Sequence, residues 1–300
     1  MNYTQFDNIN NKKSIFKLCR MCFDKKYALE QHILQIKYNL EVAKKNNNHD
    51  LYKDIIIELI SIEKNQYQFY KIIDIYYNTA IYFKNNHRYD LSVIFYTNLI
   101  EEYNNRNLSN VELTYLGNIH DELADVFIEL NNYYESINNY VRATHYLYKC
   151  NYDYRLISIN FKIAIAKILS LKFLDAIFIF EKIIFENDKY LTNSNNTYYI
   201  TFIILCYICL FDLEREPYLQ MNTIRKILDN YKKKYIDYCE TTEYTTVKNI
   251  ISSVDNLDTA QFASNAQNIT INSKNNIHLA FITIFSHINK YVSAKIKLKS

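Results

Sequence analysis

The sequence predicts an all-α protein built from antiparallel helix hairpins. The first observation behind this prediction is that the 300 residues include only one glycine, Gly117, and one proline, Pro217. All-β folds need many tight turns, and several of the common turn types favour glycine. The same shortage excludes Rossmann and P-loop nucleotide sites, because both use several glycines to bring the backbone close to phosphate.

The second observation is a helical pattern that recurs three times. Ala80, Ala124 and Ala164 each open it, and the copies start 44 and then 40 residues apart. Each alanine is followed at fixed offsets of 9, 12, 13 and 16 residues by an aromatic, a small, a β-branched and a second aromatic residue: Tyr89, Tyr133 and Phe173; Ser92, Ser136 and Ala176; Val93, Ile137 and Ile177; Tyr96, Tyr140 and Phe180. Small residues let two antiparallel helices pack closely, and repeats of 20–50 residues are typical of solenoids. We therefore expect a TPR-like right-handed superhelix of antiparallel helix hairpins with a C-terminal helical bundle.

The same pattern divides the chain into two predicted domains. Residues 1–235 form the helical-repeat solenoid, and residues 236–300 form the C-terminal bundle with a basic tail. Within the first domain, residues 1–64 show two apolar helical stripes separated by the polar Asn46–His49, without a repeat match. Residues 104–110 and 193–196 are predicted connections. Residues 198–232 resemble a fourth hairpin, with Pro217 in the first turn of its second helix, where a missing N–H costs nothing.

A search for catalytic and metal-binding patterns finds none that has supporting context. Two C-x-x-C pairs, Cys19 with Cys22 and Cys206 with Cys209, could hold zinc or a redox couple. Both pairs lie in apolar helical segments, which favours buried structural cysteines. His120, Asp121, Glu122 and Asp125 could form an acid–base pair, but a solvated acidic helix face is the stronger interpretation. We expect no enzyme activity, no cofactor, no metal and no small-molecule substrate.

Charge and hydropathy narrow the range of partners. A net charge of +3 is too small to indicate a nucleic-acid partner. The longest apolar stretch, residues 198–211, is shorter than the 20 or so residues that span a bilayer. The N-terminal residues show no export signal, so we expect a cytoplasmic protein with reduced cysteines. Five lysines and no acid lie in residues 273–300, which fits a solvated helix end, an acidic partner or an anionic membrane.

Residues 65–292 resemble the soluble NSF attachment proteins, the SNAP family. The resemblance is carried by the order and spacing of several segments, among them ELADVFIELNNYYESINNYVRATHYLYK, NFKIAIAKILSLKFLDAIFIFEKI and TYYITFIILCYICLFDLE. It implies an adaptor that binds the four-helix SNARE complex through a basic face and recruits the hexameric AAA ATPase NSF. It also implies peripheral contact with the membrane.

The resemblance implies candidate contact residues as well. Lys162 falls where the family has a basic residue on the helix face used for SNARE contact, and Arg142, Lys149 and Arg155 are further candidates. Leu298, third from the end, is the candidate ATPase contact, because the family ends in acidic residues with a leucine next to last. Here lysines surround that leucine. Ile15 and Phe16, flanked by lysines, are the candidate membrane contacts. The alternative function is a TPR-like scaffold that binds another peptide or helix.

Overall fold

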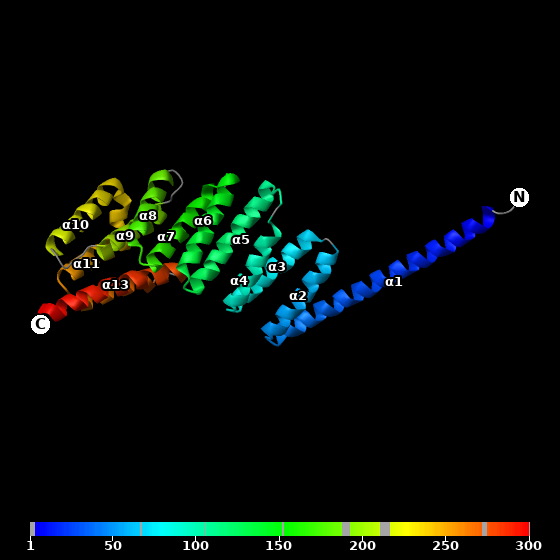
Figure 1. Ribbon diagram of the computed structural model, residues 1–300. Coiled ribbons are helices and arrows are strands. Elements are labelled where there is room, and N and C mark those ends of the chain that lie inside the picture. The colour runs from blue at the N-terminus through cyan, green and yellow to red at the C-terminus, as the bar shows by residue number, and fades with distance from the viewer. Residues whose placement is uncertain are drawn as a thin grey trace. The chain divides into compact units, whose positions relative to one another are not determined.

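The computed structural model describes residues 4–66, 68–104, 106–151, 153–187, 193–210, 217–271 and 275–299 (Figure 1). Every regular element in these ranges is a helix, which confirms the predicted all-α class. The chain divides into two compact units, residues 1–102 and 103–300. The predicted boundary at residue 235 stays a prediction.

The first unit contains four helices: α1 (Thr4–Lys45), α2 (His49–Asn65), α3 (Phe69–Asn85) and α4 (Tyr89–Glu102). Consecutive helices pack together as antiparallel pairs. Helix α1 packs on α2 through its C-terminal part, where Ile36, Leu40 and Ala43 are buried, and its N-terminal part extends away from α2 (Figure 1). The polar break predicted at Asn46–His49 is confirmed for residues 46–48, because α1 ends at Lys45, whereas His49 is already the first residue of α2.

The second unit begins with three hairpins. They are α5 (Asn110–Glu129) with α6 (Tyr133–Lys149), α7 (Asp153–Leu169) with α8 (Phe173–Asn187), and α9 (Asn193–Leu210) with α10 (Pro217–Lys234). Pro217 is the first residue of α10, as its missing N–H predicts. Residues 193–196, predicted as a connection, instead form the first turn of α9. Polar asparagines suit that position because the first N–H groups of a helix have no partner within it.

The C-terminal elements pack on the first helices of these hairpins. They are the short helix η1 (Ile236–Glu240), α11 (Thr242–Asp255), α12 (Thr259–Ile271) and α13 (Asn275–Lys299). Helix α13 contacts α7, α9 and α12, while α11 contacts α9, α10 and α12 (Figure 1). Helix α9 is therefore enclosed, which explains why its sequence is apolar on all sides. The predicted buried helix in this segment is confirmed for its described residues.

A stack of phenylalanine rings joins α8, α9 and α13. The rings of Phe180 and Phe202 lie 5.4 Å apart and nearly parallel, and the rings of Phe202 and Phe281 lie 4.5 Å apart. Phe285 continues the stack along α13, with its ring 5.9 Å from that of Phe281. Phe180 is the second aromatic of the third repeat. The stack therefore fixes the C-terminal helix directly onto the repeat core.

The repeat pattern marks the contact inside each hairpin. Ala80, Ala124 and Ala164 are all 0% exposed, as predicted, and each lies in the first helix of its pair. The aromatic residue nine positions later is always the first residue of the second helix. In the first copy, the buried Ser92 hydroxyl donates a hydrogen bond to the Ala80 carbonyl at 2.9 Å. The small residues therefore bring the two backbones of a hairpin into close approach.

Three-residue linkers close these hairpins without glycine. The central linker residue has a positive φ of 58° at His87, 56° at Asn131 and 60° at Leu171. In each case the next N–H bonds to a carbonyl five residues back, as in the Arg88–Phe83, Asn132–Phe127 and Lys172–Lys167 pairs. This is the Schellman helix end, which usually places glycine at the left-handed position. Leu171 is therefore the most strained of the three, because leucine has no side-chain means of stabilising this conformation.

Gly117 marks another close approach, between α5 and α6. A Cβ atom built on Gly117 would lie 2.8 Å from Leu147 Cγ and 3.4 Å from the Ala143 carbonyl oxygen. Leu147 is fully buried, so its side chain has little room to withdraw. Glycine at this position therefore serves the packing of the two helices.

We predict that Gly117→Ala destabilises the protein by about 1–2 kcal/mol, because overpacking against Leu147 outweighs the roughly 1 kcal/mol that alanine gains in helix propensity. The free energy of unfolding in urea, followed by circular dichroism, measures the effect. The paired variant Gly117→Ala with Leu147→Ala removes the clash, so the cost of adding Gly117→Ala should disappear in that background. An equal cost in both backgrounds would contradict the packing argument.

We also predict that Leu171→Gly stabilises the protein by about 1 kcal/mol, because glycine adopts the left-handed conformation without a Cβ penalty. Leu171 is largely exposed, so little apolar contact is lost. Asn131→Gly is the matched control, and its gain should be smaller because asparagine tolerates this conformation. The urea midpoint reports both changes, and a lower midpoint for Leu171→Gly would show that the linker is not strained.

Candidate protein-interaction surface

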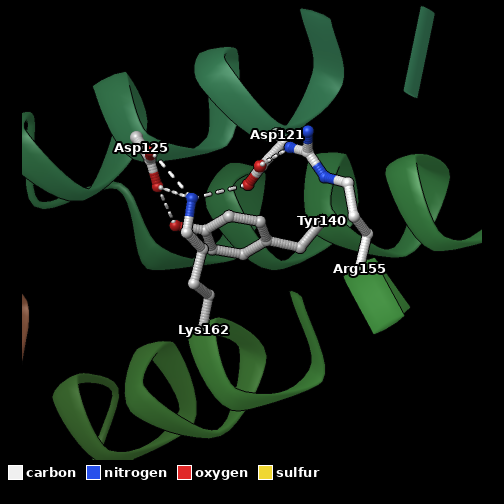
Figure 2. Close-up of polar contacts among 5 residues, drawn as sticks. All are labelled: Asp121, Asp125, Tyr140, Arg155 and Lys162. Carbon is white, nitrogen blue, oxygen red and sulfur yellow. Dashed lines mark hydrogen bonds and ion pairs between the residues drawn. The ribbon is translucent and has the colours of Figure 1, made fainter. Parts of the chain in front are cut away.

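A cluster of charged side chains joins α5, α6 and α7 (Figure 2). Lys162 on α7 places its Nζ 2.7 Å from Asp121 Oδ1 and 3.0 Å from Asp125 Oδ2, and both aspartates lie on α5. Arg155, about two helix turns before Lys162, donates to Asp121 Oδ2 at 3.2 Å. The Tyr140 hydroxyl on α6 donates to Asp125 Oδ1 at 2.5 Å. Two carboxylates and two cations are thus gathered at one place, and their formal charges cancel.

Burial and the neighbouring charges together set the protonation of this cluster. Burial by itself lowers the pKa of Lys162, but the two carboxylates outweigh it, so that its pKa lies above the ordinary lysine value. Burial and the Asp125 carboxylate raise the pKa of Tyr140, so its phenol keeps its proton and donates. The Lys162 ammonium also lies 5.6 Å from the centre of the Tyr140 ring. Lys162 therefore remains a cation, and its ion pairs with Asp121 and Asp125 offset its charge.

The solvated acidic face predicted around His120 and Asp121 is wrong, because both side chains are buried. His120 Nδ1 lies 2.8 Å from Asn139 Oδ1, and its ring stacks on that of Tyr146 at 5.5 Å. Burial lowers the pKa of His120, which keeps the imidazole neutral. These groups pack α5 against α6. Among the described residues, no three histidine, cysteine or acidic side chains are arranged to bind a metal ion.

Cys206 and Cys209 lie in the apolar helix α9. Their surroundings fit the prediction of buried structural cysteines. Cys206 is fully buried, and burial raises the pKa of its thiol well above the ordinary value. Burial raises the pKa of Cys209 in the same way. Both thiols therefore stay protonated and unreactive at neutral pH. The side chains of Cys19 and Cys22 lie outside the described residues.

The four candidate SNARE contacts separate into two groups. Lys162 and Arg155 belong to the charged cluster, and the Lys162 side chain is only 29% exposed. Arg142 and Lys149 lie exposed on α6, so their charges face solvent. Two of the four candidates are therefore held in ion pairs within the protein, and the other two face solvent.

The candidate contacts at the two ends of the chain lie in helices whose side chains are only partly described. Ile15 and Phe16 fall in α1, and Leu298 falls in α13, but their side chains lie outside the described residues. The described part of α13 carries Lys290, Lys295 and Lys297 toward its C-terminal end, and the Lys295 ammonium lies 5.8 Å from the centre of the Tyr291 ring. In the described part of the chain, no helix combines the length and the apolarity that crossing a bilayer requires.

An apolar groove between α8 and α10 is the feature that sequence reasoning missed. It has a volume of about 550 Å³ and is lined by side chains of both helices and by Tyr235, the residue after α10: Phe178, Glu181, Lys182, Ile184, Phe185, Glu186, Tyr231, Lys234 and Tyr235. Phe178 and Phe185 are 68% and 81% exposed. The sequence does contain a signal for this groove. Helix α8 carries large apolar residues on both faces, which is more than one buried face needs. Exposed clusters of this kind mark interaction sites.

We predict that Lys162→Met destabilises the protein by roughly 2–3 kcal/mol, below the 3–5 kcal/mol of a fully buried pair, because it leaves two carboxylates facing each other in a half-buried site. Lys149→Met is the matched control and should change the free energy of unfolding by less than about 0.5 kcal/mol. Urea unfolding of both variants measures the difference. Equal effects would mean that the charged cluster contributes nothing to stability.

The chain was compared with protein families, curated proteins and solved structures. No curated protein matches it. Two solved structures of TPR-like repeats of a kinesin light chain from Podospora anserina, one of them a point variant, are similar to it. The point variant is 11% identical and covers 66% of this chain and 97% of its own, while the other structure is 12% identical and covers 66% and 96%. Both have a TM-score of 0.44.

The comparison with family models gives a clear result. The model described as "Soluble NSF attachment protein, SNAP" matches residues 112–275, which is more than half of the chain. The matched range begins in α5 and reaches the start of α13, so it includes the charged cluster, the groove and most of the C-terminal elements. The protein therefore belongs to the family of soluble NSF attachment proteins.

Proposed function

We propose that the protein is a SNAP-type adaptor that binds assembled SNARE complexes and recruits an NSF-type AAA ATPase, which then takes the complex apart. The observation that carries this proposal is the family match over residues 112–275. Adaptors of this family act without catalysis of their own, so the proposed role is binding alone. The expected setting is the cytoplasmic side of a membrane, with peripheral contact through Ile15 and Phe16.

The exposed charges support a SNARE-type partner. A SNARE bundle presents acidic surfaces, so opposite charges would speed the encounter and fix its orientation. Arg142 and Lys149 face solvent on α6, seven residues and about two helix turns apart. They are the members of the candidate set that can offer their full charge to a partner. Leu298 remains the proposed ATPase contact, and residues 236–300 the proposed C-terminal domain.

A second candidate function is a helical-repeat scaffold that binds another helix or peptide. The groove between α8 and α10 favours it, because an apolar groove with aromatic walls suits helix binding in general. The two functions differ in their partner, and binding to assembled SNARE complex and NSF separates them.

The test is binding of the full-length protein to assembled soluble SNARE complex, with and without NSF, at low and physiological salt. We expect the double variant Arg142→Glu with Lys149→Glu to bind about tenfold more weakly, because reversing two exposed charges costs roughly 1.4 kcal/mol. The loss should shrink at high salt, where exposed charges are screened.

The control is Lys248→Glu, which reverses an exposed charge on α11 in the C-terminal region. It should bind SNARE complex as the unchanged protein does. If the unchanged protein binds neither SNARE complex nor NSF, even at low salt, the adaptor proposal is wrong and the scaffold is favoured.

A further inference from the structure

We propose that a polar cavity between α11 and α12 binds an ammonium or guanidinium group carried beside a carbonyl oxygen, as in a lysine or arginine residue of a peptide. The cavity has a volume of about 540 Å³, and its walls come from α11, α12, Glu240 at the end of η1 and Tyr198 on α9. It shares no lining residue with the groove between α8 and α10. The site is independent of the proposed function, since it needs neither a SNARE complex nor an ATPase.

Two mostly polar helix faces meet at this cavity. Within each helix the lining residues stand three or four positions apart, which places them on one face. They are Thr242, Thr245, Thr246 and Asn249 on α11, and Asn265, Asn268 and Ile269 on α12. Helix α11 supplies its core contacts from other positions, where four aliphatic residues are buried: Val247, Ile250, Ile251 and Val254. The polar face of α11 is therefore not required by the apolar core.

A buried amide in the wall of the cavity lacks a partner. Asn265 is only 8% exposed, its side chain lines the cavity, and its Nδ2 has no hydrogen-bond partner in the described part of the chain. A buried donor without an acceptor destabilises a fold, and such groups are uncommon in native proteins. The terminal torsion of asparagine is soft, so a small rotation turns this amide toward a bound molecule. The wall at Asn265 therefore calls for a ligand that supplies an oxygen acceptor.

The threonine hydroxyls of the cavity donate their protons within the protein. Thr245 donates to the Thr241 carbonyl oxygen at 3.4 Å, and Thr246 donates to the Thr242 carbonyl oxygen at 2.7 Å. The Thr242 hydroxyl donates to Glu243 Oε2 at 3.1 Å, and the Thr241 hydroxyl donates to a carbonyl oxygen of η1 at 2.7 Å. What these hydroxyls still offer is lone pairs, so a ligand beside them has to donate.

The charge at the cavity is negative. Glu240 and Glu243 line it, and no basic side chain is among its described lining residues. The positive end of α11 is already matched by the protein itself, because Glu243 lies in the first turn and the Thr241 hydroxyl accepts from the Tyr244 N–H at 3.2 Å. An anion would meet two carboxylates of like charge, whereas a cation is attracted by them.

These properties together determine the class of ligand. Ammonium and guanidinium groups carry a positive charge and several N–H donors, which suit the carboxylates and the threonine lone pairs. A metal ion is not favoured, because the described residues hold no group of three histidine, cysteine or acidic side chains that could bind one. An organic cation without a carbonyl group leaves the Asn265 amide without an acceptor. A lysine or arginine residue satisfies both requirements, since its peptide carbonyl oxygens accompany the charge.

The test follows the threonine methyl groups of the full-length protein by NMR during titration with the peptide acetyl-Gly-Ala-Arg-Ala-Gly-amide. We expect the signals of Thr245 and Thr246 to shift and to saturate. The same peptide with citrulline, an uncharged isostere of arginine, should bind about tenfold more weakly, because a charge-assisted contact is lost. Butylguanidinium, which is the arginine side chain without a carbonyl oxygen, should bind about fivefold more weakly. The inference is wrong if these threonine signals do not move, or if either comparison compound binds as tightly as the arginine peptide.

Two variants separate a binding site from a merely structural cavity. Asn265→Leu should weaken binding of the arginine peptide about fivefold and raise the urea midpoint, because an apolar side chain of similar size replaces an unpartnered buried amide. Glu240→Gln with Glu243→Gln should weaken binding about tenfold, whereas the control Glu30→Gln with Glu101→Gln, which removes two exposed carboxylates from α1 and α4, should not change it. If Asn265→Leu lowers the midpoint or binds the peptide unchanged, the amide is structural and the site is refuted. The adaptor proposal stands in either case, since the assay contains neither SNARE complex nor NSF.

Discussion

Close contact between small side chains is the constraint on which each hairpin depends. Ala80, Ala124 and Ala164 have no exposed surface, and the second helix always begins nine residues after them. A larger side chain at these positions would separate the two backbones, because protein interiors have few voids to absorb it. The linker has only three residues, so it cannot compensate for such a shift. Register, separation and direction of the two helices are thereby fixed together.

In the second unit, the close packing within each hairpin determines which helix surfaces remain accessible to partners. The first helices α7 and α9 are covered by the C-terminal elements, and the phenylalanine stack through Phe180, Phe202 and Phe281 holds α13 in place. The second helices α8 and α10 keep an outer side that nothing in the described part of the unit covers. The two helices of a hairpin thus have different roles. The first helices complete the core with the C-terminal elements, and the second helices face outward.

The fold was more predictable from sequence than the interaction surface. Fixed offsets from three alanines predicted the hairpins, because helical packing repeats with the chain. The contact of Lys162 with Asp121 escaped prediction because it joins residues 41 positions apart and depends on the register between two hairpins. The groove at Phe178 escaped because an apolar residue in a helix is ordinarily assigned to the core. The left-handed conformation of Leu171 also escaped prediction, because no glycine in the linker indicates it.

The charged cluster uses Lys162 in ion pairs within the protein, which reduces the charge that this residue presents to solvent. Two charges attract a partner only through the field that they leave uncancelled, and salt screens that field over about 8 Å under physiological conditions. Asp121 and Asp125 lie within 3.2 Å of the cations that face them, so a partner at normal contact distance meets a nearly neutral group. Arg142 and Lys149 lie outside the charged cluster, so Asp121 and Asp125 do not cancel their charges. The exposed cations Arg142 and Lys149 lie on α6, the second helix of its hairpin, whereas Lys162, the lysine that the family resemblance singles out, lies on the first helix α7.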